Sequence, residues 1–238
     1  SNKGTVRIYT YSGGSWSQQG SDLDGEAAND YQGSSVSLSS DGTILAVGAY
    51  GHASNKGTVR IYTYDGTSWS QQGSDLDGEA ADDFQGWSVS LSSDGTTLAV
   101  GAYKHGASAS RKGTVRIYTY SGGSWSQQGS DLDGAENNSR QGSSVSLSSD
   151  GTTLAVGADL HDGKGTVRIY TYSGGSWSQQ GSDLDGAASD DQGSSVSLSS
   201  DGTKLAVGAY GHDSNKGTVR IYTYSGGSWS QQGSDLDG

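Results

Sequence analysis

The feature that most constrains the fold is a repeat of roughly 50 residues. The phrase GTVRIYTY occurs five times, with its glycine at Gly4, Gly57, Gly113, Gly165 and Gly217. The steps between these glycines are 53, 56, 52 and 52 residues. A period of this size is typical of solenoids, propellers and other repeat arrays. The chain is therefore built from four near-copies of one unit and part of a fifth.

The composition agrees with a folded repeat and excludes some partners. Only 30% of the residues are hydrophobic and 40 of 238 are glycine, which on its own would indicate disorder. The apolar residues nevertheless recur at fixed alternating positions, as they do in strands. The formal net charge of −12 disfavours nucleic acid, which requires clustered basic residues. No apolar run reaches membrane-spanning length, so direct membrane insertion is not expected.

One repeat reads as four strands, which we name A to D by their position in the unit. In the repeat from 34 to 86, strand A is expected at 35–39, strand B at 45–49, strand C at 57–64 and strand D from 69 toward 76. Asp41-Gly42 supplies a hairpin turn between A and B. No segment has a helical apolar period, so helix is expected to be essentially absent.

A single unit has too few apolar residues to be stable alone, so each sheet must pack against its neighbours on both faces. Four-stranded antiparallel sheets arranged radially meet this need, which predicts an all-β fold of the β-propeller type. Strands C and D occur five times but A and B only four times. We therefore expect a half blade at 1–33 and blades at 34–86, 87–142, 143–193 and 194–238. The surplus half blade predicts a longer array, with neighbouring repeats or other copies of the chain as partners.

Length variation between the copies is confined to the B–C and D–A loops, which emerge at the same end of an antiparallel blade. Loops held on a rigid scaffold commonly carry binding sites, so this end is the candidate ligand-binding face. Trp87 occupies the place of Ser34, Ser143 and Ser194. It is either an aromatic platform for a sugar or a local packing variant. The other candidate ligand-binding residues are in the B–C loops: Tyr103, His52, His105, His161 and His212.

The same end is rich in carboxylates, which with loop carbonyls are ligands that calcium prefers. The candidate calcium ligands are Asp22, Asp24, Asp30, Asp75, Asp77, Asp82, Asp131, Asp133, Asp183, Asp185 and Asp190. The alternative is that they are solvated, turn-favouring residues. Calcium is thus the one candidate cofactor, and none is required. Asn137 opens the only N-glycosylation sequon, in a D–A loop.

The segment 32–49 resembles an FG-GAP repeat, with Val47-Gly48-Ala49 matching its Val-Gly-Ala end, and the match recurs at 85–102, 141–158 and 192–209. Such repeats form integrin α-chain propellers and occur in many microbial and algal proteins. The resemblance implies a propeller, an extracellular or cell-surface location and adhesion or ligand binding. Two departures matter. Glutamine replaces the family's phenylalanine at Gln32, Gln85, Gln141 and Gln192, and the family's calcium loop keeps only its last acid, Asp41, before Gly42.

The leading functional hypothesis is a non-enzymatic extracellular scaffold with a structural or adhesive role, such as a glycoprotein of a surface or filament. The alternative is a propeller that binds carbohydrate or protein ligands through the B–C and D–A loops. No catalytic residue is assigned, because a catalytic site needs unlike residues that converge, whereas these blades repeat the same ones. The chain is therefore predicted not to be an enzyme.

Overall fold

The computed structural model describes residues 2–106 and 110–238, and nearly all of its regular structure is β-strand. The N-terminal half blade has two hairpin-like pairs, β1 (Thr5–Val6) with β4 (Leu23–Asp24) and β2 (Tyr9–Ser12) with β3 (Ser15–Gln18). Four blades follow. At position A they have β5 (Ser35–Leu38), β10 (Gln85–Leu91), β15 (Gln141–Leu147) and β20 (Gln192–Leu198). At position B they have β6 (Ile44–Ala49), β11 (Thr97–Ala102), β16 (Thr153–Ala158) and β21 (Lys204–Ala209).

The outer half of each blade contains strand C and a divided strand D. Position C is filled by β7 (Thr58–Tyr64), β12 (Thr114–Ser121), β17 (Thr166–Ser173) and β22 (Thr218–Ser225). Strand D begins as β8 (Trp69–Gln71), β13 (Ser124–Gln127), β18 (Ser176–Gln179) and β23 (Ser228–Gln231). It resumes as β9 (Leu76–Asp77), β14 (Leu132–Asp133), β19 (Leu184–Asp185) and β24 (Leu236–Asp237).

Each blade is antiparallel in the order A-B-C-D, which confirms the predicted all-β fold of repeated four-stranded sheets. The predicted continuous strand D is interrupted, and both of its pieces pair with the same strand C. Gly73 lies in the break with a left-handed φ of 81°, which interrupts the regular pleat. Strands β10, β15 and β20 begin two residues before the blade boundaries drawn from the sequence.

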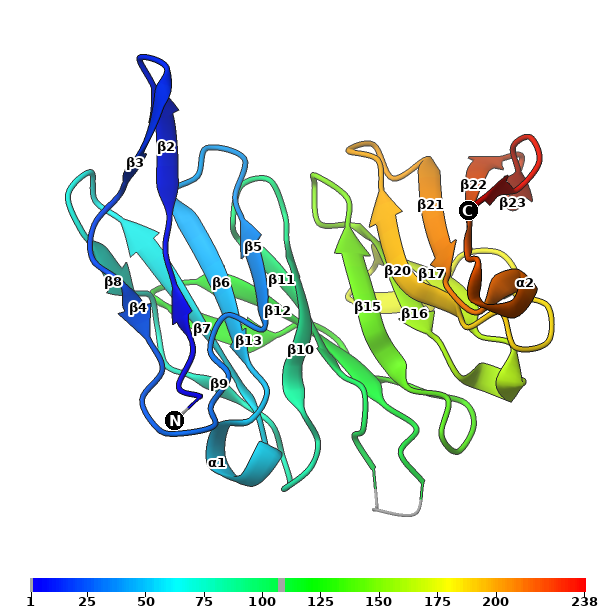
Figure 1. Ribbon diagram of the computed structural model, residues 1–238, viewed down its shortest axis with the longest axis horizontal. Coiled ribbons are helices and arrows are strands. Elements are labelled where there is room, and N and C mark those ends of the chain that lie inside the picture. The colour runs from blue at the N-terminus through cyan, green and yellow to red at the C-terminus, as the bar shows by residue number, and fades with distance from the viewer. Residues whose placement is uncertain (1, 107–109) are drawn as a thin grey trace.

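The blades are arranged with their A strands toward the middle of the molecule and their D strands outside (Figure 1). The hydrophobic core lies between blades. Val59 and Ile61 of one blade pack with Leu91 and Leu98 of the next, and the equivalent clusters recur along the chain. Both faces of an interior sheet are thus covered by neighbours, as the sparse apolar content requires. The half blade and the last blade lie at opposite ends of the long axis (Figure 1).

Serine and glycine make the close approach of successive blades possible. A Cβ atom built on Gly101 in strand B would lie only 2.2 Å from the backbone oxygen of Gly142 in the next blade. The Ser88 hydroxyl donates to that same oxygen across the interface at 2.8 Å. The Ser90 hydroxyl accepts the backbone N–H of Leu147 at 3.0 Å. The abundant serine therefore has a structural role at the inner edge of the blades.

The B–C loops contain short helical turns that the sequence pattern does not predict. These are α1 (His52–Asn55), η1 (His161–Gly163) and α2 (His212–Asn215). Ala53 and Ser54 have φ values of 48° and 62°, so α1 is a left-handed loop turn rather than a regular helix. Within 2–106 and 110–238, no helix is both long and apolar enough to cross a membrane.

Candidate ligand-binding surface at the loop end

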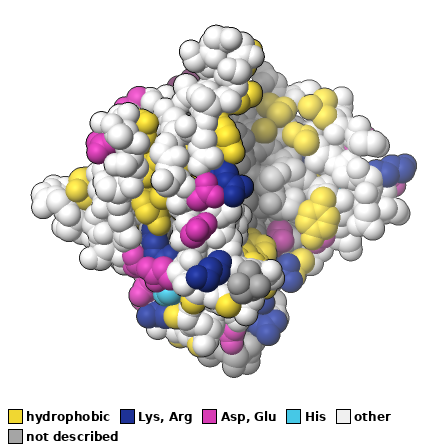
Figure 2. Space-filling view, turned by 60° about the vertical axis from the view of Figure 1, so that its left-hand side comes forward, with side chains coloured by type: hydrophobic (Ala, Val, Ile, Leu, Met, Phe, Trp, Pro, Cys, Tyr) yellow, Lys and Arg dark blue, Asp and Glu magenta, His cyan; other side chains and the backbone are white. Residues whose placement is uncertain are grey.

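The B–C and D–A loops lie together at one end of the molecule, which we call the loop end. Backbone hydrogen bonds join them: Gly51 N–H donates to the Asp30 carbonyl at 3.1 Å, and Phe84 N–H donates to the Asn55 carbonyl at 2.9 Å. By the boundaries drawn from the sequence, the first of these bonds joins the half blade to the blade at 34–86, and the second lies within that blade. Figure 2 shows basic and acidic side chains close together in the lower part of the molecule, which is this end. The predicted variable face is therefore one connected surface.

Beneath this surface, strand C of each complete blade carries a buried arginine that the sequence pattern does not reveal. Arg116 is 2% exposed. Its Nε donates to Asp131 and its Nη1 donates to the Gln85 side-chain oxygen, both at 2.8 Å. The Gln85 amide donates in turn to the Leu76 carbonyl at 2.8 Å. The glutamine that replaces the family's phenylalanine thus completes a buried polar network between blades.

The equivalent arginines Arg60, Arg168 and Arg220 pair in the same way with Asp75, Asp183 and Asp235, and Arg7 pairs with Asp22. Hydrogen bonds from Arg7 and Gln18 lower the pKa of Asp22. Burial raises the pKa of Asp183, but hydrogen bonds from Arg168 and Gln179 outweigh it, and the net shift is downward. These four predicted calcium ligands, Asp22, Asp75, Asp131 and Asp183, are therefore occupied as arginine partners.

A second group of aspartates, which includes the predicted calcium ligands Asp30 and Asp190, caps the D–A loops. The Asp83 carboxylate is buried and accepts the backbone N–H groups of Glu79 and Ala80 at 3.1 and 2.9 Å. Asp30 makes the equivalent bonds, and Asp190 accepts the N–H of Ala187. Asp82 is exposed and accepts from the Asn55 amide at 3.0 Å. The remaining four, Asp24, Asp77, Asp133 and Asp185, end the short strands that pair with strand C and are exposed.

The four loop histidines lie against these groups rather than on an open surface. His52 Nδ1 is 3.3 Å from Asp30, His105 Nδ1 is 3.2 Å from Asp83 and His212 Nδ1 is 2.9 Å from Asp190. In the loop before the third complete blade, Ser139 stands where the other loops have the capping aspartate. His161 lies 3.3 Å from Arg168, and His105 and His212 lie at similar distances from their arginines. Their side chains are 13–26% exposed. They therefore take part in the loop network, and their contact with a ligand stays a prediction.

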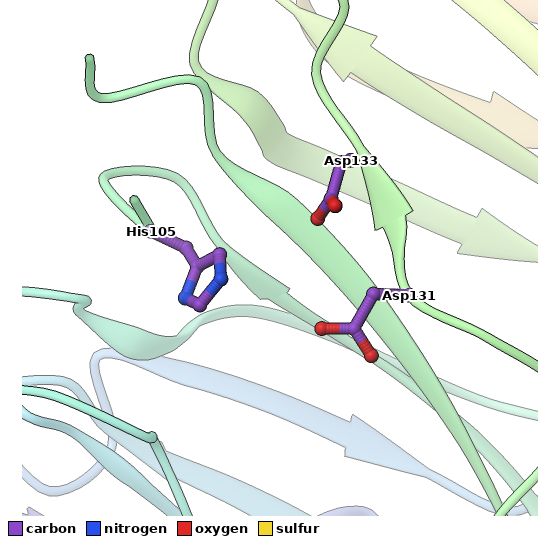
Figure 3. A group of neighbouring side chains, drawn as sticks. All are labelled: His105, Asp131 and Asp133. Atoms are coloured by element: carbon purple, nitrogen blue, oxygen red, sulfur yellow. The ribbon is translucent and has the colours of Figure 1, made fainter. Parts of the chain in front are cut away.

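Figure 3 shows one of two equivalent candidate cation sites, where the ring of His105 and the carboxylates of Asp131 and Asp133 face a common space; the other consists of His212, Asp235 and Asp237. One ligand atom from each residue lies within 4.8 Å of the other two. The guanidinium of Arg116 already pairs with Asp131, and Asp83 lies beside the His105 ring. At the A–B turn, the single Asp41 carboxylate is held by Ser39 and Thr43. The side chains at these two places supply only part of the about 6–8 oxygen ligands that calcium takes, so calcium binding stays a prediction.

The predicted residues Trp87 and Tyr103 do meet, with ring centroids 4.3 Å apart. They belong to a connected group that we call the aromatic row. The row consists of Tyr31, Tyr50, Phe84, Trp87 and Tyr103, with centroid separations of 4.3–5.8 Å between contacting rings. Trp87 is 37% exposed, whereas Tyr103 is only 8% exposed. Sequence reasoning missed Tyr31, Tyr50 and Phe84.

The backbone that presents this row is strained. Tyr31 and Phe84 have left-handed φ values of 54° and 60°, as do Arg140 and Asp191 at the equivalent positions. A bulky side chain in this region is uncommon, and such outliers cluster at functional sites. The sequence marks this position, because its residue differs from repeat to repeat: Tyr, Phe, Arg and Asp occupy it in turn.

Asn137, the predicted glycosylation residue, is exposed, while Ser139 of its sequon is fully buried.

Comparison with known proteins identifies the repeat. The FG-GAP repeat model matches residues 69–118 and 177–222. Each match runs from the start of strand D through strand C of the next blade. No curated protein matches the sequence.

Solved structures share the fold. A proposed 6-phosphogluconolactonase from Bacteroides uniformis has a TM-score of 0.64 at 16% identity, over 100% of this chain and 69% of its own. The periplasmic gluconolactonase of Pseudomonas aeruginosa has a TM-score of 0.66 at 20% identity, over 97% and 63%. A proposed 6-phosphogluconolactonase from Bacteroides fragilis has a TM-score of 0.67 at 14% identity, over 98% and 65%. The chain thus spans 63–69% of the length of these structures.

These neighbours contradict the prediction that the chain is not an enzyme. That prediction relied on the likeness of the blades, but the same arrangement of sheets is found in proteins described as lactonases. Near-identical strands leave the loops free to differ, so repetition in the scaffold does not exclude catalysis. At 14–20% identity the likeness establishes the fold alone.

Proposed function

We propose, because the chain is an FG-GAP-like β-propeller repeat protein, that it is an extracellular or cell-surface scaffold with an adhesive role that binds carbohydrate at its loop end. The observation that carries this proposal is the aromatic row, which crosses two blades. The apolar C–H faces of sugar rings pack against aromatic rings, and binding sites are lined by aromatic residues with a few polar groups.

The row is local, which favours recognition over general packing. Trp87 stands where the three other blades have serine. At a second register, three blades have Tyr50, Tyr103 and Tyr210, and the third complete blade has Asp159. The tryptophans that recur at strand D of the complete blades have a different role. Trp125 packs against Gly73 of the preceding blade and donates to the Gln72 carbonyl at 3.2 Å. The tryptophans of the complete blades stabilise blade contacts, while Trp87 is available to a ligand.

Glycan-array binding tests the proposal. Trp87→Ser installs the residue that the other blades carry at this register, so the fold should be retained. We expect loss of glycan binding in this variant, with an unchanged circular dichroism melting temperature. Trp16→Ser is the matched control, because Trp16 is 69% exposed at the opposite end, in the half blade. Unchanged glycan binding by Trp87→Ser, or no binding by the parent protein, would contradict the proposal.

A further inference from the structure

Basic side chains that are not part of the repeat gather at the aromatic row. Ten of the 14 lysines and arginines recur in every repeat, either before the strand C glycine or within strand C. The remaining four are Lys104, Arg111, Arg140 and Lys204. Three of these are at the loop end beside the aromatic row, whereas Lys204 begins β21 at the other end of its blade. Chain segments separated by up to 36 residues thus bring their only additional positive charges to one place.

Each of these three basic side chains contacts the aromatic row or lines a pocket beside it. Lys104 Nζ lies 4.1 Å from the centroid of Phe84 and 5.2 Å from that of Tyr103. The Arg140 guanidinium lies 5.9 Å from the Tyr103 centroid. Lys104 and Arg111 line a pocket of ≈ 210 Å³ together with Ala81, Asp82, Phe84 and Gly106. A cation over the face of an aromatic ring is held there by attraction to the ring. Its N–H groups are then positioned to donate to a ligand that stacks on the neighbouring rings.

These three basic side chains form few ion pairs with the rest of the described chain. Within 2–106 and 110–238, neither Lys104 nor Arg111 forms a salt bridge, and Arg140 has only Asp159 at 3.7 Å. The repeated arginines, in contrast, are buried against carboxylates, as with Arg116 and Asp131 at 2.8 Å. A chain with a net charge of −12 repels anions in general. Basic side chains with no carboxylate partner or only a distant one, gathered at one aromatic surface, therefore favour an anionic ligand there.

We propose that the loop end binds acidic polysaccharide, that is, a polymer of sugar rings bearing carboxylate or sulfate groups. This inference rests on the proposed carbohydrate-binding function and names its ligand class. Sugar rings stack on Trp87 and its neighbours, and the acidic groups accept charge-assisted hydrogen bonds from Lys104, Arg111 and Arg140. A row of successive rings suits a polymer of repeated units better than a single small anion.

The test compares polymers that differ in charge. Binding of polygalacturonate (carboxylate), dextran sulfate (sulfate) and dextran (neutral) is measured by biolayer interferometry at 50 and 300 mM NaCl. Preference for either acidic polymer over dextran, weakened by salt, is expected because screening reduces charge-assisted binding. The carboxylate and sulfate arms identify which acidic group is recognised.

Two variants assign the effect to residues. Lys104→Leu installs the residue found at the same register in Leu160, and we expect about tenfold weaker binding of the acidic polymer, equivalent to about 1.4 kcal/mol, with dextran binding unchanged. Lys204→Thr removes one positive charge at the other end and matches Thr97 and Thr153, so it should leave binding unchanged. Equal binding of acidic and neutral polymers, both abolished by Trp87→Ser, would overturn this inference while retaining the proposed function. Absence of binding to any polymer would overturn both.

Discussion

At the scale of single residues, the strand C arginine contributes differently to stability in the half blade, where it is exposed, and in the complete blades, where it is buried. Arg7 and Arg116 each pair with an aspartate 15 residues later. The side chain of Arg7 is 49% exposed, whereas that of Arg116 is 3% exposed and also donates to Gln85 of the preceding loop. Removing one partner of a buried pair leaves an uncompensated charge, which is far more costly than losing an exposed pair.

We therefore expect Arg116→Leu to lower the free energy of unfolding by about 1–3 kcal/mol, because the buried side-chain oxygen of Gln85 would lose its donor. Arg7→Leu at the equivalent position should change it by about 0–1 kcal/mol. Urea denaturation followed by tryptophan fluorescence measures both. Equal effects of the two substitutions would show that the network contributes no more than an exposed ion pair.

These residues also show what a single sequence can predict. Alternation places Arg60 and Arg116 on the face of strand C opposite the valine and isoleucine, and this is correct. Their burial was not predictable, because the covering Gln32 and Gln85 come from the preceding loop, 28 and 31 residues away. Trp87 and Tyr103 were found as departures from the repeat. Phe84 and Lys104 were missed, because their role depends on loops meeting in space.

At the scale of the element, strand B determines how closely blades approach. The structure explains why residues in this strand are small: the backbone of the next strand A lies directly on Gly48, Gly101 and Gly157. Gly208 occupies the same register in the last blade, where the nearest obstacle is the rotatable hydroxyl of Ser195 at 2.3 Å. The space beside this strand B glycine is thus limited by the next blade's backbone in the first three complete blades and by a side chain in the last.

Gly101→Ala should destabilise the protein by about 1–3 kcal/mol, since the new methyl group would force the Gly142 backbone away and disturb the interface. Gly208→Ala is the matched control and should cost clearly less, because only a side chain must rotate. Thermal denaturation with a calorimeter measures the difference. A larger effect at Gly208 than at Gly101 would show that intrablade strain, rather than blade-to-blade contact, selects this glycine.

At the scale of the whole molecule, the contacts between successive blades are nearly interchangeable. The bridges Gly57 to Gln85, Gly113 to Gln141 and Gly165 to Gln192 join the start of one strand C to the start of the next strand A. The core clusters between blades contain equivalent residues. In such quasi-one-dimensional arrays, stability is approximately a sum of repeat and neighbour-interface terms. Stability should therefore tolerate removal of an interior repeat, whereas the proposed binding site should not.

Deletion of residues 85–140 joins Phe84 to Gln141, and deletion of residues 141–191 joins Arg140 to Gln192. Both variants keep the glycine-to-glutamine bridge between the blades that become neighbours, so both should fold with strand-rich circular dichroism and cooperative melting. Only the first removes Trp87, Tyr103 and Lys104, so it alone should lose carbohydrate binding. Loss of binding in both variants would place recognition in the assembled blades as a whole. Retention in both would exclude the aromatic row as the binding surface, because the scaffold would then bind without it.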